Sequence, residues 1–284
     1  MLKAAILRAV IDIGSNSVRL MTEGAKDKLI RSTQLSEGLS LTGRLNIDAM
    51  TRTAEAVREF YGRAIDKGAV KVYVFATEAV RSAANGGEFL ALMKECGISV
   101  DILSPEREAE AGFVGASLGG RAVVVDIGGA STEITIGGGR GIVFSQSLAL
   151  GVVKLRDLFG QDSLKIKDYT DNAVKGLGKL PPIDYAVAIG GTASTIAAIL
   201  SGGYDRDRIH RYHLKYAEIE DVLGRIETSR DLSAIKGLPQ MRRTIIKGGI
   251  LLLLSIMEYM KLTEVIVSEE DNMEGYLRLL DNKK

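Results

Sequence analysis

The order of apolar and polar positions along the chain predicts alternating strands and helices. Apolar runs rich in β-branched residues are typical of strands, and apolar positions with a period near 3.6 are typical of helices. Strands are predicted at 8–13, 17–22, 28–34, 71–75 and 98–103, and helices at 47–67, 87–96 and 105–117. An opening three-stranded meander followed by alternating strands and helices indicates an α/β layer with a mixed sheet.

The second part of the chain begins in the same way. Three strands are predicted in RAVVVDIG, STEITIG and GIVFSQSLAL, and further ones in YAVAIG, RYHLKY and EVIVS. Helices are predicted at 152–159, 164–179, 216–228 and 241–261, and from Thr192 and residue 271 onward. Gly119 and Gly120 precede the repeat, so we predict two α/β domains with a cleft between them, 1–119 and 120–284, with the last helix packing back on the first domain.

Composition adds mainly exclusions. A chain of 284 residues suits two domains, and 37 basic against 36 acidic side chains give no reason to expect a nucleic-acid or membrane partner. With 46% hydrophobic and 26% charged residues the protein is expected to be soluble and globular, and a homodimer stays open. A single cysteine, Cys96, excludes a disulfide framework and is expected to be a buried, inert thiol.

Two apolar stretches could be mistaken for targeting or membrane segments. In MLKAAILRAVIDIG, Arg8 and Asp12 interrupt the apolar run, so the hydrophobic region of a signal peptide is missing and a cytoplasmic location is expected. The stretch 248–260 is shorter than the roughly 20 residues of a membrane span. It also carries Glu258, so we predict a core helix.

A short motif occurs twice. It reads DIGSNS where it begins at Asp12, and DIGGAS where it begins at Asp126, 114 residues later. Glycine allows a tight turn and a close approach to a ligand, and successive backbone N–H groups form an anion-binding nest. Either copy alone is also typical of an Asx or Ser turn that closes a hairpin. Two copies at domain-scale spacing favour a two-sided phosphate site. Its predicted residues are Gly14, Ser15, Asn16, Ser17, Gly128, Gly129, Ala130, Ser131 and Thr132.

Further donors are predicted near these turns. AIGGTAST places Gly191 and Thr192 at the start of a helix, where free N–H groups attract anions, although a plain N-cap has the same pattern. Thr77 ends a buried strand, and Arg81 follows one helical turn later. Arg19 lies in an otherwise apolar strand, where it faces either the substrate or solvent.

The helix predicted in PEREAEAGFVGA carries the most informative carboxylate. Glu106 and Glu110 share one face and are expected to be solvated. Glu108 lies on the opposite side with Gly112 and Gly115, whose small size is expected to leave room for water and substrate. A partly desolvated glutamate there is a candidate general base towards water.

Several other acids and the two histidines are candidate metal ligands. The carboxylates of Asp12 and Asp126 accept hydrogen bonds only, so they suit Mg²⁺ or water better than direct phosphate contact. Glu133 follows DIGGAST and is predicted at the same metal or its water. His210 and His213 are three apart on a predicted strand and would point to opposite faces, so a zinc site is not expected.

The motifs DIGSNSVRL, ATEAVRSAAN, LSPEREAEAGFVGA, VVVDIGGASTEITIG, LALGVVKL and AIGGTAST, in this order, resemble the exopolyphosphatase and guanosine pentaphosphate phosphohydrolase (Ppx/GppA) family over nearly the whole chain. The resemblance implies two ribonuclease H-like domains of the actin-like superfamily with the active site between them. It also implies hydrolysis of the terminal phosphoanhydride of polyphosphate or guanosine pentaphosphate, with Mg²⁺ or another divalent cation.

The resemblance assigns roles to individual positions. Glu108 would be the catalytic base, Asp126 and Glu133 the acids around the metal and its waters, and Gly128 part of a phosphate loop. The substrate phosphates would be bound from the first domain by Asp12, Ser15, Asn16, Ser17, Arg19 and Arg81.

The chain departs from the family pattern in three motifs. Ala130 stands where GGGSTE has glycine, and Met273 stands where Arg-Glu-Gly has arginine. The Arg-Ala-Asp pattern is matched by Arg242, Arg243 and Thr244, so its acid is missing. The resemblance is to the short form, which lacks the C-terminal HD-like helical domain. Two other functions stay open, namely an actin-like kinase or ATPase and a non-catalytic polyphosphate or alarmone sensor.

Overall fold

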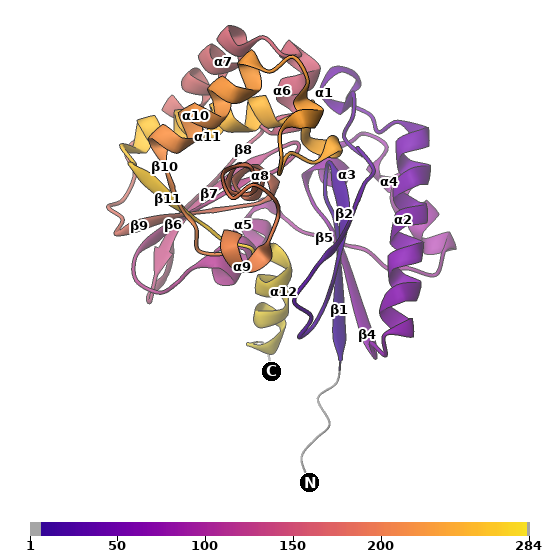
Figure 1. Ribbon diagram of the computed structural model, residues 1–284. Coiled ribbons are helices and arrows are strands. Elements are labelled where there is room, and N and C mark those ends of the chain that lie inside the picture. Colours follow the sequence, from indigo (N-terminus) through magenta and orange to yellow (C-terminus); the bar gives the residue numbers. More distant parts are fainter. Residues whose placement is uncertain (1–6, 283–284) are drawn as a thin grey trace. The chain divides into compact units, whose positions relative to one another are not determined.

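The computed structural model describes residues 7–282, so part of the apolar N-terminal stretch that we considered as a signal peptide lies outside the described residues. The chain forms two compact units, Met1–Ser104 and Pro105–Lys284 (Figure 1). Each unit contains one mixed β-sheet, which confirms the predicted α/β class.

The sheet of unit 1 has the strand order β3-β2-β1-β4-β5. β1 pairs antiparallel with β2 and parallel with β4, as expected for a meander followed by a crossover. The strands are β1 (Arg8–Ile13), β2 (Ser17–Thr22), β3 (Leu29–Ser32), β4 (Lys71–Ala76) and β5 (Asp101–Ile102). The helices are α1 (Leu39–Thr42), α2 (Ile47–Asp66), α3 (Glu78–Ser82) and α4 (Gly86–Glu95).

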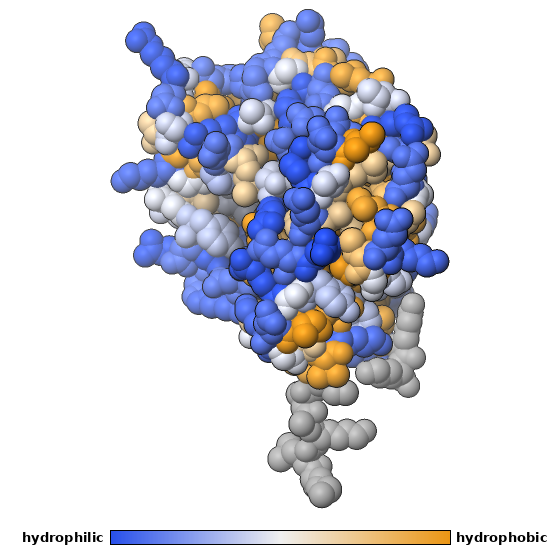
Figure 2. All heavy atoms as spheres, turned by 90° about the vertical axis from the view of Figure 1, so that its right-hand side faces the viewer, coloured by the Kyte–Doolittle hydropathy of each residue, from blue (hydrophilic) through white to orange (hydrophobic). Residues whose placement is uncertain are grey.

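The core of unit 1 lies between its sheet and its helices. Asn46 caps α2 by accepting from the backbone N–H groups of Asp48 and Ala49, at 2.8 and 3.3 Å. The apolar face of α2 then packs into a buried cluster that includes Ile11, Val57 and Phe89. On the face shown in Figure 2, apolar side chains lie in small groups among polar ones.

Unit 2 has a six-stranded sheet of order β10-β11-β9-β6-β7-β8. Its strands are β6 (Ala122–Ile127), β7 (Thr132–Gly138), β8 (Gly141–Leu148), β9 (Tyr185–Ile189), β10 (His213–Lys215) and β11 (Glu264–Val267). Its helices are α5 (Pro105–Ala116), α6 (Val152–Phe159), α7 (Ser163–Lys175), α8 (Gly191–Leu200), α9 (Arg206–Ile209), α10 (Tyr216–Thr228), α11 (Ile246–Met260) and α12 (Asn272–Asp281).

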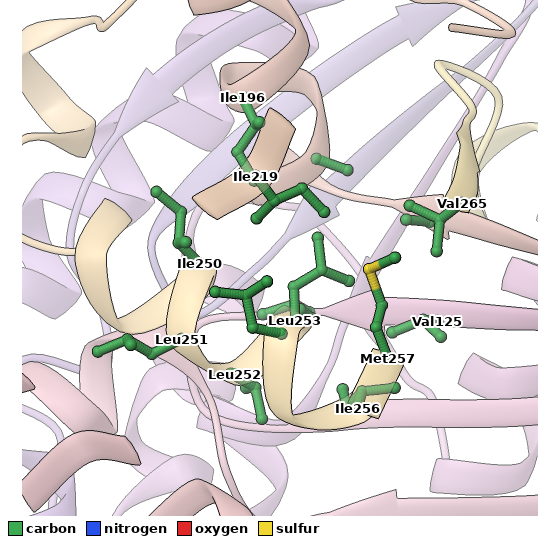
Figure 3. Close-up of a cluster of buried hydrophobic side chains, with 14 of the residues drawn as sticks. Val125, Ile196, Ile219, Ile250, Leu251, Leu252, Leu253, Ile256, Met257 and Val265 are labelled. Atoms are coloured by element: carbon green, nitrogen blue, oxygen red, sulfur yellow. The ribbon is translucent and has the colours of Figure 1, made fainter. Parts of the chain in front are cut away.

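The core of unit 2 is built around α11. Its Ile250, Leu252 and Leu253 are fully buried with side chains from the sheet and from neighbouring helices, such as Val125 and Ile219 (Figure 3). The predicted core helix is therefore confirmed. Within residues 7–282 no helix is both long and apolar enough to cross a membrane.

The helix α5 packs on the sheet of unit 2. Its Phe113 belongs to a buried cluster with Ala122, Val124 and Val187. On β7, a Cβ at Gly137 would come within 2.8 Å of the Phe113 ring, so the glycine makes room for it. Contacts thus divide the chain after Ser104, whereas we expected the division after Gly119, because α5 is needed to cover this sheet.

The last helix, α12, packs on α5 through two glycines. A Cβ on Gly115 would lie 1.9 Å from the Asp271 carbonyl oxygen, and one on Gly275 would lie 1.8 Å from the Ala111 oxygen. Arg278 donates to the carbonyl of Gly115 at 2.8 Å. The expectation that small residues on this face of α5 leave open space is therefore wrong, because α12 fills it.

A polar cluster joins α7 to α11 on the outside of unit 2. Asp171 accepts from Lys167 and from Ser255, both at 2.6 Å, and Lys167 also binds Glu258 at 2.7 Å. Partial burial would raise the pKa of Asp171, but the hydrogen bonds from Lys167 and Ser255 outweigh it and hold that pKa below its usual value.

Two smaller expectations differ from the structure. Cys96 follows α4 and is half-buried rather than buried. His210 ends the short helix α9 instead of lying in a strand with His213, because Asp205 caps that helix by accepting from the N–H of Asp207.

Candidate functional site

The first glycine turn joins β1 to β2. The Gly14 N–H donates to the Ser17 carbonyl at 3.0 Å and closes the turn. The Ser15 carbonyl accepts from the N–H of Ser36 at 2.9 Å, and the Asn16 carbonyl accepts from the N–H of Thr33 at 3.1 Å. The segment after β3 therefore binds the carbonyl side of this turn.

The second glycine turn repeats this arrangement between β6 and β7. The Gly128 N–H donates to the Ser131 carbonyl, again at 3.0 Å. The carbonyls of Gly128 and Gly129 accept from the N–H groups of Val152 and Val153, at 3.0 and 2.8 Å. This approach requires Gly151 in LALGVVKL, where a Cβ would lie 2.4 Å from the Gly129 carbonyl carbon.

Both turns can bind anions through their backbone. In a trans peptide the C=O and the following N–H point in opposite directions. Because the carbonyls of Ser15, Gly128 and Gly129 point into the protein, the N–H groups of Asn16, Gly129 and Ala130 point the other way. In the second turn Gly129 and Ala130 are two such donors in succession, which form a nest suited to a phosphate oxygen, and the first turn adds the single donor of Asn16.

Beside the first turn, Asp12 and Arg19 are directly opposite each other on β1 and β2. Arg19 donates to one Asp12 oxygen through Nε at 2.8 Å and through its terminal nitrogen at 2.5 Å. Asp12 is buried and Arg19 is half-buried, so the alternative of a solvent-facing arginine does not hold.

The other candidate residues of unit 1, Thr77, Arg81 and Asn16, are buried or bound by neighbouring residues of that unit. Thr77 is buried directly after β4, as predicted. Arg81 donates to the Glu78 carboxylate and to the Leu103 carbonyl, so these contacts hold its guanidinium in unit 1. The side chain of Asn16 is buried as well, which leaves its backbone N–H as the group available to an anion.

Two predicted hydroxyls of unit 2 serve packing. Thr132 is fully buried and donates to the Leu150 carbonyl at 2.6 Å. The Thr192 hydroxyl lies against α11, 2.5 Å from the position of a Cβ on Gly249. These side chains fix the turn and the start of α8, and their hydroxyls are directed into the unit.

Two carboxylates lie side by side on the sheet of unit 2. Asp126 and Glu133 are opposite each other on β6 and β7, so their Cβ atoms are about 5 Å apart on the same face. Glu133 is buried and accepts from Ser147 at 2.7 Å. One Asp126 oxygen lies 3.0 Å from the position of a Cβ on Gly190, at the start of AIGGTAST.

Glu108 is on the helix that covers this same face of the sheet. Ala122 and Val124 face α5, and Asp126 follows in the same alternation. The Gly112 position is 3.3 Å from the Ile189 side chain, and Ile189 pairs with Asp126. Glu108 lies one turn before Gly112, toward the Asp126 end, and it is buried.

The neighbouring glutamates behave differently from Glu108. Glu106 and Glu110 are exposed, as the helical period predicts.

The three acids that we predict to act together, Glu108, Asp126 and Glu133, all belong to unit 2.

Arg242 is a candidate that the predicted site left out. Its terminal guanidinium nitrogen occupies the space of a Cβ on Gly191, 1.5 Å from that position, so the guanidinium lies directly over the backbone at the start of α8. A positive charge there adds to the positive end of the helix dipole. The only signal in the sequence was the partial match to the Arg-Ala-Asp pattern.

The chemistry of Asp126 and Glu133 fits Mg²⁺. Mg²⁺ is commonly held by one or two carboxylates together with water and substrate phosphates. Among residues 7–282 no group of three or more His, Cys, Asp or Glu side chains is arranged to hold a metal ion. Water and substrate phosphates would therefore have to complete the coordination of Mg²⁺ at Asp126 and Glu133.

Comparisons with known proteins agree on one family. The sequence model of the Ppx/GppA phosphatase family matches residues 13–281. A bifunctional 3-dehydroquinate synthase/phosphatase of Fusobacterium nucleatum is 30% identical over 99% of this chain, which spans 48% of that relative's length. Exopolyphosphatase 2 of Mycobacterium tuberculosis is 26% identical, over 94% of this chain and 96% of its own. The crystal structure of the Aquifex aeolicus Ppx/GppA family member is 28% identical and superposes with a TM-score of 0.79, covering 98% of this chain and 99% of its own.

Proposed function

This chain belongs to the Ppx/GppA phosphatase family, and on that premise we propose that it is a hydrolase that releases the terminal phosphate of a linear phosphoanhydride. The substrate is inorganic polyphosphate or guanosine pentaphosphate. The observation that carries the proposal is that Glu108 is buried on α5, the helix that packs on the sheet face to which Asp126 and Glu133 also belong. Each unit also contains a glycine turn closed by the same backbone hydrogen bond, from the N–H of Gly14 or Gly128, and this repeat supports the proposal.

In the proposed reaction the two glycine turns bind phosphate oxygens through their N–H groups. Arg242, lying over the start of α8, adds positive charge. Asp126 and Glu133 would hold Mg²⁺, which would neutralise charge on the phosphates. Positioning and electrostatic stabilisation then provide most of the catalysis, as is usual in phosphoryl transfer.

Glu108 is proposed as the general base. Its carboxylate accepts a proton from a water molecule while the water oxygen forms a bond to the terminal phosphorus. The anhydride bond on the opposite side breaks, and the leaving phosphate oxygen takes the electron pair. Burial of Glu108 shields its carboxylate from bulk water, which favours this role.

The test compares two glutamates of one helix. Glu108→Gln is expected to lower kcat by about 10²- to 10⁴-fold, with unchanged thermal unfolding. Glu110→Gln, on the exposed face of α5, is the matched control and should keep full activity. Equal phosphate release by the Glu108 variant and wild type would remove Glu108 as the base.

The substrate is determined by phosphate release from short and long polyphosphate, guanosine pentaphosphate and ATP, each with and without Mg²⁺. We expect release from polyphosphate or guanosine pentaphosphate that depends on Mg²⁺. Transfer of phosphate to a sugar or acid would instead identify a kinase. Tight binding without turnover would identify a sensor.

A further inference from the structure

Three buried polar side chains lie behind the first glycine turn. Asn16, Thr33 and Ser36 are 6%, 2% and 2% exposed. Both polar atoms of the Asn16 amide and the hydroxyls of Thr33 and Ser36 are buried and make no hydrogen bond to any residue from 7 to 282. Because both ends of the amide are affected, the choice between its nitrogen and oxygen positions does not alter this observation.

Backbone hydrogen bonds bring the three residues together. The N–H groups of Thr33 and Ser36 donate to the carbonyls of Asn16 and Ser15, at 3.1 and 2.9 Å. Between them Leu35 is fully buried in the core of unit 1, which anchors the segment. Arg52 of α2 donates to the Thr33 carbonyl at 3.2 Å from the other side.

The chemistry of these side chains indicates which small molecule would bind between them. A buried polar group without a partner destabilises the fold more than an apolar group of the same shape, so three such neighbours indicate a polar guest. All the groups are neutral and together provide both donors and acceptors, which suits water rather than a phosphate. A buried water typically makes about three hydrogen bonds.

We infer that Asn16, Thr33 and Ser36 bind one internal water molecule, and that Thr33 and Ser36 are thereby positioning residues for the first glycine turn. The water would hold the Asn16 amide and so fix the direction of the Asn16 N–H. Its consequence for the substrate rests on the proposed function, in which that N–H binds a phosphate oxygen.

The kinetic test removes hydroxyls while keeping shape. Thr33→Val and Ser36→Ala are each expected to raise KM for tripolyphosphate about five- to tenfold, with kcat within about twofold of wild type. The reason is that loss of the one shared water weakens phosphate binding by the N–H group of the turn. The double variant should be little worse than either single one, since both lose the same water. Thr33→Ser and Ser36→Thr retain the hydroxyl and should restore KM.

A matched control is available in the same unit. Thr53 is fully buried, but its hydroxyl donates to the Ala49 carbonyl within α2, at 2.7 Å. Thr53→Val should therefore leave KM unchanged. If Thr33→Val and Ser36→Ala also leave KM unchanged, the positioning role is overturned.

A high-resolution crystal structure tests the water itself. We expect one ordered water within about 3.2 Å of at least two of the three side chains in wild type, and none in the double variant. Direct side-chain pairing with no water would overturn the inference. If wild type hydrolyses neither polyphosphate nor guanosine pentaphosphate, the proposed function fails, while the water site is still decided by the crystal structure.

Discussion

The carboxylate of Asp171 shows how a single residue ties stability to pH. Its pKa is lower in the folded protein than the usual 3.8, because the hydrogen bonds from Lys167 and Ser255 outweigh the effect of burial. A group with a depressed folded pKa stabilises the fold at pH values above its unfolded pKa. That contribution is lost as pH falls through the folded pKa.

Asp171→Asn is therefore expected to lower Tm at pH 6, and this difference should shrink progressively as pH falls below about 3.8 and through the lower folded pKa. The side chain is 36% exposed, so solvent screening limits the contribution to about 1 kcal/mol, or up to about 4 °C. Thermal unfolding from pH 7 to 3 measures it. Asp168→Asn, exposed on the same helix, is the control. A Tm difference that stays constant to pH 3 would contradict the assignment.

Single residues were predictable where helical or strand periodicity decides their face. The period of α5 correctly separated buried Glu108 from exposed Glu106 and Glu110. The partners of individual polar groups were not predictable. The Thr132 hydroxyl binds a carbonyl 18 residues away, and the Thr192 hydroxyl packs on α11. Such partners are set by packing between distant segments, which local patterns do not contain.

At the scale of elements, the contact between α5 and α12 depends on the absence of side chains. Gly115→Ala would place a methyl group 1.9 Å from a backbone oxygen of Asp271. We expect it to lower the free energy of unfolding by about 1–3 kcal/mol, in spite of the higher helix propensity of alanine. Chemical denaturation measures the change.

Gly224→Ala in α10 is the matched control. No atom lies within 4 Å of its Cβ position, so alanine should stabilise the protein by about 0.5–1 kcal/mol. If both substitutions stabilise the protein equally, the close packing of α5 on α12 is not present in solution.

Most elements were predictable because their apolar period is long and regular. The bounds expected for α2, 47–67, agree with Ile47–Asp66 to one residue. The four-residue helices α1 and α9 were missed, since each is too short to show a helical period. Of the predicted strand 98–103, only Asp101–Ile102 pairs, at the edge of its sheet.

At the scale of the whole molecule, the two units have separate hydrophobic cores. Phe89 lies in the core of unit 1 and Leu253 in that of unit 2, both fully buried. Calorimetry is expected to show two unfolding transitions, each affected by one variant. Phe89→Ala should lower the free energy of unfolding of unit 1 by about 3–5 kcal/mol, and Leu253→Ala that of unit 2 by about 2–5 kcal/mol. A single transition that both variants shift equally would show that the chain unfolds as one cooperative unit.

The sequence repeat correctly indicated two similar halves but misplaced their border. Gly119 and Gly120 are a strong local signal for a break, whereas the assignment of α5 depends on which sheet it covers. That contact involves Phe113 and strands up to 74 residues further along the chain, including Val187. A local composition signal could not reveal it.

The position of α5 also determines where the gene can be divided. A fragment that begins at residue 120 would leave Val124 and Val187 without the helix that buries them. Such a fragment would expose an apolar sheet face and tend to aggregate. A fragment that begins at Pro105 keeps that cover together with all three candidate acids, so it is the natural unit for expression, domain exchange or fusion to another protein.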